Sequence, residues 1–147
     1  TVIKHIPGHG LSKVDSHKKL PVVSKDINYL NKFDFFPFKK QKSLLAMTAH
    51  IIYNSIDKKN TATHSKKVLN IIRKKILFKN LIMSDDISMK ALKFSVSKNT
   101  TQAFNAGCNL VLHCNGKYNE MVIVAKNSPL LSDFAVKKTS QLLNIIR

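Results

Sequence analysis

The chain has 147 residues, enough for one domain with a hydrophobic core and too few for two domains of ordinary size. Its hydrophobic content of 44% and charged content of 22% are typical of folded globular proteins and exclude global disorder. No apolar run reaches the ~20 residues of a membrane-spanning helix. The N-terminus also lacks the basic-then-apolar pattern of a signal peptide, so no membrane partner is predicted.

The formal net charge of +17 raises the question of nucleic-acid binding. Arg73 and Arg147 are the two arginines, and the other basic residues are lysines scattered along the chain. Aromatic residues do not alternate with them as in base-stacking surfaces. The pattern favours a solvated lysine-rich surface, and a basic nucleic-acid-binding module remains the weaker alternative.

Four short runs that are apolar nearly throughout predict strands of the parallel, doubly covered kind. They are Thr1–Ile6, Leu44–His50, Leu81–Ser84 and Asn109–His113. The first is followed by a long loop, Gly8–Lys40, which holds glycines, prolines and a phenylalanine cluster and is expected to end in a short helix.

Amphipathic stretches separate the later runs. Apolar residues recur at helical spacing from Val68 to Ile76, with Thr63 or Ser65 as the expected cap. A second helix is expected from Ser88 to Gly107, and a third from Ser128-Pro129 to Ile146. Four strand–loop–helix units predict an α/β fold with a parallel sheet, either a small open sheet or half of a (β/α)8 TIM barrel.

Cys108 and Cys114 lie six residues apart, on either side of the last predicted strand. Six residues of strand span about 20 Å, which is beyond the reach of a disulfide. Two unpaired thiols favour a reducing compartment, and the cytoplasm is therefore the expected location.

Asp85 and Asp86 are notable because acidic residues are scarce, eight in all, and this pair directly follows an apolar run. In α/β folds, catalytic groups gather at the carboxyl ends of strands. On position alone, a pair of carboxylates stabilising a helix N-terminus is an equally good interpretation.

Histidines occur at the same expected edge: His5 and His9 flank Pro7-Gly8 where the first strand ends, His50 ends the second strand and His113 the fourth. A metal site is disfavoured, because Pro7-Gly8 excludes a helical histidine pair and no carboxylate-rich cage is available. A different arrangement is Asp15-Ser16-His17, in which a carboxylate two residues away can orient an imidazole and favour its protonated form. Such an imidazole can donate and recover a proton near neutral pH. On these residues alone, a surface loop with an incidental contact between Asp15 and His17 is the better interpretation.

These residues resemble the glycoside hydrolase family 3 β-N-acetylglucosaminidases of bacterial cell-wall recycling. The resemblance extends over nearly the whole chain, in five ordered blocks. They are Lys4-His5-Ile6-Pro7-Gly8-His9-Gly10 with Asp15-Ser16-His17 and Leu20-Pro21; Asp34-Phe35-Phe36-Pro37-Phe38; Met47–Tyr53 with Asp57 and Ala62-Thr63; Ser84–Met89; and Ala106–Asn115.

The resemblance implies a retaining hydrolase that releases terminal GlcNAc from GlcNAc–anhydroMurNAc muropeptides, with no metal or organic cofactor. It makes Asp85 the nucleophile and His17, oriented by Asp15, the acid/base group, a dyad that replaces one carboxylic acid of most glycosidases. It makes Lys4 and His5 sugar-binding residues. Leu11 and Asn109 depart from the family pattern, but neither has a chemical role in this scheme.

The resemblance further implies that residues 1–147 form the C-terminal half of a (β/α)8 barrel domain, about its last four β/α units. The first half would lie outside this chain. A half encoded by a split or decaying gene, a half that pairs with a separate N-terminal chain or with itself, and a truncated enzyme are the three explanations. A non-catalytic remnant of the same ancestry is therefore an alternative to the enzyme.

Overall fold

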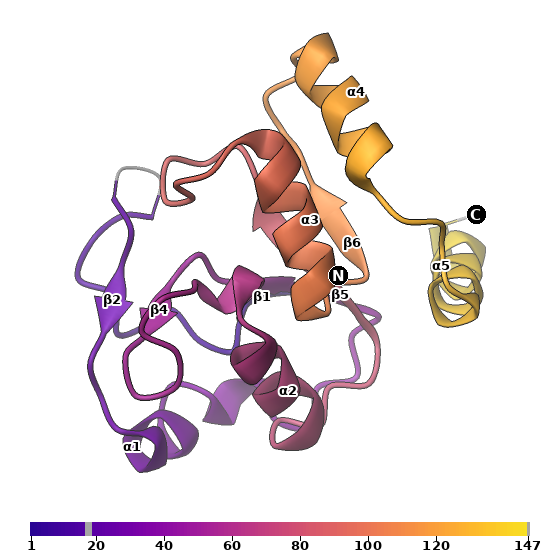
Figure 1. The fold of residues 1–147 in the computed structure, drawn as a ribbon. Helices are drawn as coiled ribbons and strands as arrows, with labels where there is room; N and C mark the ends of the chain where they lie inside the picture. Colours follow the sequence, from indigo (N-terminus) through magenta and orange to yellow (C-terminus); the bar gives the residue numbers. More distant parts are fainter. Residues whose placement is uncertain (17–18, 147) are drawn as a thin grey trace.

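The computed structural model describes the backbone of residues 1–16 and 19–146. A four-stranded parallel sheet forms its centre, in the order β1-β3-β5-β6 (Figure 1). The strands are β1 Val2–Ile6, β3 Leu45–Thr48, β5 Leu81–Asp86 and β6 Leu110–Leu112. All four predicted strands and their parallel pairing are confirmed. The prediction ended the third strand at Ser84, whereas β5 continues through Asp85 and Asp86.

A second, two-stranded parallel sheet was not predicted. It pairs β2, Val22–Val23, with β4, Ile52–Tyr53. These strands lie in the loops that follow β1 and β3, and two residues are too few to show the alternation that identifies a strand. Their pairing joins the two loops beyond the carboxyl ends of the main strands.

The N-terminal helices follow the predicted pattern closely. The helix expected at the end of the long loop is α1, Ile27–Lys32, followed by the 3-10 turn η1, Phe36–Phe38. A second 3-10 turn, η2 Ala62–His64, leads into α2, Lys66–Lys74. Of the two candidate caps, Ser65 is the one used, since its hydroxyl accepts the amide of Val68 at 3.3 Å.

The C-terminal helices differ from the prediction in three respects. Helix α3, Val96–Ala106, ends at Gly107 as expected, where φ is +120°, but it begins under a Ser95 cap and not at Ser88. Helix α4, Tyr118–Asn127, was missed. Ser128 ends α4, so the last helix, α5 Asp133–Ile146, begins later than expected.

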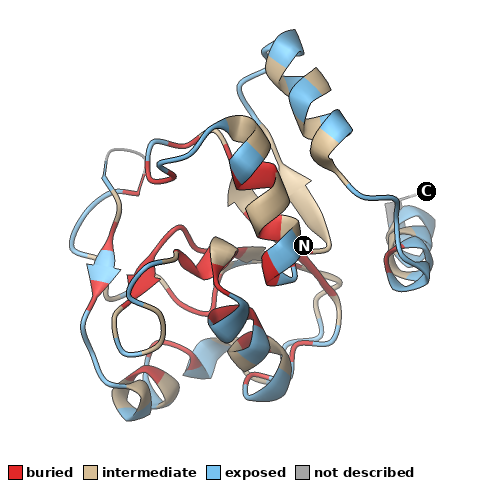
Figure 2. Cartoon of the chain, in the orientation of Figure 1, coloured by how far each residue is buried: buried red, intermediate tan, exposed pale blue. Residues whose placement is uncertain are grey.

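The core is formed by the sheet, helices α2 and α3 and the segments that follow β1 and β3, and includes Phe35, Tyr53, Ile72, Phe78 and Ile82. Helices α4 and α5 are largely exposed, as Figure 2 shows. Both cysteines are free thiols, as predicted, with Cys108 buried and Cys114 exposed. No helix in the described ranges is long and apolar enough to cross a membrane.

The first testable prediction concerns His64 of η2, whose burial, together with nearby His50, lowers its pKa from 6.5 to about 4. The unfolded chain therefore binds a proton that the folded chain does not, so stability falls as pH drops from 6.5 towards 4. The loss reaches roughly 3 kcal/mol at the lower limit. Urea unfolding at several pH values measures it. His64→Gln is the control, and an equal acid loss in that variant would contradict the assignment.

Candidate active site

The two carboxylates at the end of β5 have different partners. Asp86 Oδ1 accepts the amide of Ser88 at 3.0 Å and that of Cys114 at 3.2 Å, and the Ser88 hydroxyl lies 2.8 Å from both Asp86 oxygens. Asp86 therefore ties the end of β5 to the segment after β6. Neither aspartate caps a helix, because α3 begins only at Val96. The helix-terminus interpretation of the pair is wrong.

Asp85 instead points towards β1. Its Oδ2 lies 3.5 Å from His5 Nε2, and its Oδ1 accepts the amide of Asp86 at 2.8 Å. The His5 side chain is 30% exposed and that of Asp85 16%, so the pair is accessible without being fully solvated. Burial lowers the pKa of His5, and the nearby Asp85 carboxylate opposes that shift.

This contact spans the width of a strand. β3 lies between β1 and β5, and two inter-strand spacings amount to about 10 Å. The two side chains therefore converge from non-adjacent strands above the end of β3, as expected for a sheet that curves towards a barrel. The His9 ring, with its centre 5.4 Å from that of His5, extends the group into the loop after β1.

His50 contacts the backbone at the end of β5, next to Asp85. It is buried, and its Nε2 lies 2.9 Å from the carbonyl oxygen of Asp86. A carbonyl oxygen can only accept, so Nε2 carries the proton. Nδ1 is 2.8 Å from the Thr63 hydroxyl, which is 2.8 Å from that of Thr48. The sequence placed His50 at this edge, but its partners on η2 and β5 could not be foreseen.

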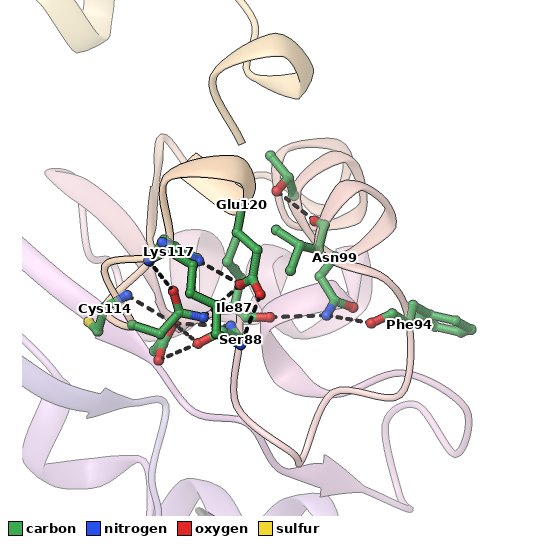
Figure 3. A network of polar contacts seen from close by, with 12 residues as sticks. Ile87, Ser88, Phe94, Asn99, Cys114, Lys117 and Glu120 are labelled. Carbon is green, nitrogen blue, oxygen red and sulfur yellow. Dashed lines mark hydrogen bonds and ion pairs between the residues drawn. The ribbon is translucent and has the colours of Figure 1, made fainter. Parts of the chain in front are cut away.

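The loop after β5 is fixed by a separate set of contacts (Figure 3). The Asn99 amide of α3 donates to the carbonyls of Ile87 and Phe94, at 3.1 and 3.0 Å. The Ile87 amide donates to the carbonyl of Leu112 at 2.9 Å. The stretch from Ile87 to Phe94, where a helix was expected, is therefore an ordered loop anchored to α3 and β6.

His113 does not face Asp85. Its Nε2 lies 2.9 Å from Glu120 Oε2 on α4, and Asn115 donates to the same oxygen at 2.6 Å. Lys117, which Figure 3 shows beside Glu120, adds an ion pair at 3.4 Å. The hydrogen bonds from His113 and Asn115 lower the pKa of Glu120 to about 2. His113 thus anchors α4, which sequence reasoning had missed.

The remaining predicted site residues lie on β1 and its loop. Lys4 is exposed on β1 next to His5. Asp15 is exposed in the following loop, and its carbonyl accepts the amide of Lys19 at 3.0 Å. His17 lies outside the described residues. The structure thus brings His5 and Asp85 together. In the described part of the chain, no group of three or more His, Cys, Asp or Glu side chains could hold a metal ion.

Comparison with known proteins gives consistent results. The family model described as the glycosyl hydrolase family 3 N terminal domain matches residues 1–141. A beta-hexosaminidase from Nitrosomonas eutropha is 36% identical over 117 residues, which is 76% of this chain and 34% of that protein. One from Psychromonas ingrahamii is 32% identical over 144 residues, 94% of this chain and 41% of that protein.

Solved structures agree. Native NagZ from Neisseria gonorrhoeae has a TM-score of 0.79 at 30% identity, over 94% of this chain and 41% of that one. The same protein in complex with N-trifluoroacetyl-D-glucosamine has a TM-score of 0.81 at 27% identity, over 95% of this chain and 41% of that one. The chain spans about a third of the length of the first curated relatives that it matches.

The second prediction tests the contact between Asp85 and His5. Replacing Asp85 by Asn removes the carboxylate that raises the pKa of His5, so this pKa, already below 6.5, falls further. An NMR pH titration of the His5 imidazole measures the change. Asp133→Asn, which removes an exposed charge on α5, is the matched control and leaves the pKa of His5 unchanged. An unchanged or raised pKa in Asp85→Asn would rule out the contact.

Proposed function

The chain belongs to glycosyl hydrolase family 3, within the part described as its N-terminal domain, and on this premise we propose that it supplies the catalytic end of a retaining exo-β-N-acetylglucosaminidase. The substrate is terminal GlcNAc on muropeptides derived from peptidoglycan, and the setting is cell-wall recycling in the cytoplasm. Relatives named beta-hexosaminidases, and one solved with an N-acylglucosamine analogue, support the substrate class. The observation that carries the proposal is Asp85, turned towards His5 where β1 and β5 end.

Asp85 is the nucleophile in this scheme. Ser88 and Cys114 donate hydrogen bonds to its neighbour Asp86, whereas Asp85 Oδ1 accepts the adjacent backbone amide and Oδ2 faces His5. A carboxylate at the carboxyl end of a barrel strand is well placed to attack the anomeric carbon of a sugar. Lys4 and His5 are the sugar-binding residues of the scheme: both lie on β1 near its end, and His5 contacts Asp85.

The acid/base group of the proposal is His17, in the loop after β1. In the first step its imidazolium protonates the glycosidic oxygen as the bond to the anomeric carbon breaks and Asp85 forms a glycosyl ester. In the second step the neutral imidazole takes a proton from the attacking water, and Asp85 leaves as a carboxylate. Asp15, two residues earlier, orients the ring and stabilises its charged form.

Four strands provide only part of a (β/α)8 barrel. In the described sheet β1 and β6 each have a single neighbour, which leaves two edges for further strands. Sugar contacts from other strands orient the anomeric carbon towards the nucleophile, and their binding energy lowers the barrier. We therefore propose that these residues, about the last four β/α units of the barrel, act together with the remaining units, either in one longer polypeptide or as a separate chain.

The third prediction follows from this incompleteness. The 147-residue chain alone releases almost no nitrophenol from 4-nitrophenyl N-acetyl-β-D-glucosaminide. Mixed with the N-terminal region of Neisseria gonorrhoeae NagZ, in an assembly verified by analytical ultracentrifugation, it gains activity. Asp85→Ala in that assembly lowers kcat by at least roughly 10³-fold, because no covalent intermediate can form.

Asp133→Asn is the control for this assay, since it removes one carboxylate from α5 and leaves kcat unchanged. An assembly of verified composition that hydrolyses nothing would favour a non-catalytic remnant. Equal activity of the Asp85→Ala assembly would show that Asp85 is not the nucleophile.

A further inference from the structure

Asp34 is a buried carboxyl group that no step of the proposed reaction uses. It lies between α1 and η1 and is 9% exposed. Its Oδ1 accepts the amide of Gly10 at 3.2 Å, and its Oδ2 has no hydrogen-bond partner. Burial raises the pKa of Asp34, and the Gly10 amide opposes the shift. A buried carboxyl with so few partners is costly, and its presence requires an explanation.

The turn Gly8–Gly10 after β1 is built around this carboxyl. A Cβ atom on Gly8 would lie 2.4 Å from Asp34 Cγ, so residue 8 must be glycine for the turn to approach so closely. On the other side of the turn, the Tyr53 hydroxyl of β4 donates to the Gly8 carbonyl. Tyr53 is fully buried and packs edge-on against Phe35, with ring centres 5.3 Å apart. Hydrogen bonds with Asp34 on one side and Tyr53 on the other thus hold the turn in place.

This turn leads directly to the candidate site. His9 is its central residue, and the His9 ring contacts that of His5. His5 in turn lies 3.5 Å from Asp85. A continuous chain of contacts therefore runs from Asp34, through the turn and two imidazoles, to the candidate nucleophile, although no contact joins Asp34 to Asp85 directly.

We propose that Asp34 is a positioning residue, which holds the Gly8–Gly10 turn so that His5 stays against Asp85. Tyr53 assists by fixing the Gly8 carbonyl on the opposite side of the turn. The importance of this arrangement for catalysis rests on the function proposed above. The arrangement itself can be measured in the chain without any turnover.

The test is a double-mutant cycle read out on His5. In the native chain, Asp85→Asn lowers the pKa of His5, and the size of the drop measures how closely the two groups are held. In an Asp34→Ala background the turn loses its anchor, and we expect this drop to shrink to less than half. In an Asp34→Asn background the amide oxygen still accepts from Gly10, and most of the drop remains.

Tyr53→Phe provides a second, milder test in case Asp34→Ala does not fold. It removes only the hydroxyl on Gly8 and keeps the ring against Phe35, so the drop in the pKa of His5 is reduced and the fold is kept. A full-sized drop in a folded Asp34→Ala or Tyr53→Phe background overturns the proposal. An equal loss in Asp34→Asn and Asp34→Ala also overturns it, because charge and not anchoring would then be responsible.

Activity separates this proposal from the one on which it rests. In the complemented assembly, Asp34→Ala lowers kcat and Asp34→Asn restores most of it. If the native assembly hydrolyses nothing, the proposed function fails, whereas the cycle on His5 still decides whether Asp34 positions the pair.

Discussion

The contact between His5 and Asp85 depends on curvature of the sheet, and the rest of the site depends on that contact. The two residues belong to strands separated by β3, and a flat sheet would keep their backbones about 10 Å apart. Bending brings the side chains together over the carboxyl end of the middle strand. The same bending gives a barrel its concave, ligand-facing end. The curvature of the sheet therefore determines both the fold and the position of the candidate catalytic groups.

Because the chain has few carboxylates, the partners of each one can be compared directly. At least five of the eight acidic residues make contacts that fix local structure within the described ranges. These are Asp26, which caps α1; Asp57, which binds Ser65 and Asn60; and Asp34, Asp86 and Glu120. Asp85, like Glu120, has a histidine neighbour, but its partner His5 is 30% exposed, whereas the His113 side chain beside Glu120 is 6% exposed. An accessible carboxylate–imidazole pair at the ends of two strands is the kind of group that an active site uses.

Much of the fold was predictable from sequence because its elements are strongly patterned. The four strands are continuous apolar runs, and α2 has a regular apolar stripe below a serine cap. The failures have physical causes. β2 and β4 are two residues long, and α4 has no buried residue. None of these three elements therefore has the pattern of apolar residues by which a strand or helix is recognised in a sequence. Ser88 resembles a helix cap in sequence, but its hydroxyl is bound to Asp86.

Part of the candidate site was likewise predictable from the sequence, and part was not. Chain position was enough to place Asp85, His5 and His50 at one edge, because parallel strands end together. It could not distinguish Asp85 from Asp86, since their partners come from β1 and from the segment after β6. It also gave no role to Asp34 or Tyr53, which act through backbone atoms of Gly8 and Gly10. A hydrogen bond from a side chain to a backbone atom does not require a particular residue type at the partner position, so the spacing of residue types in the sequence does not reveal it.

The distribution of burial indicates what the proposed enzyme still requires. Buried side chains concentrate around β1, β3 and β5, whereas β6 is only partly covered and α4 and α5 expose many apolar residues (Figure 2). An apolar helix face in water contributes nothing to folding, since burial of that surface is what stabilises a helix against its sheet. In a barrel, those faces and the open β6 edge would meet a neighbouring β/α unit. On the function proposed above, further units of the barrel would complete both the core and the sugar site.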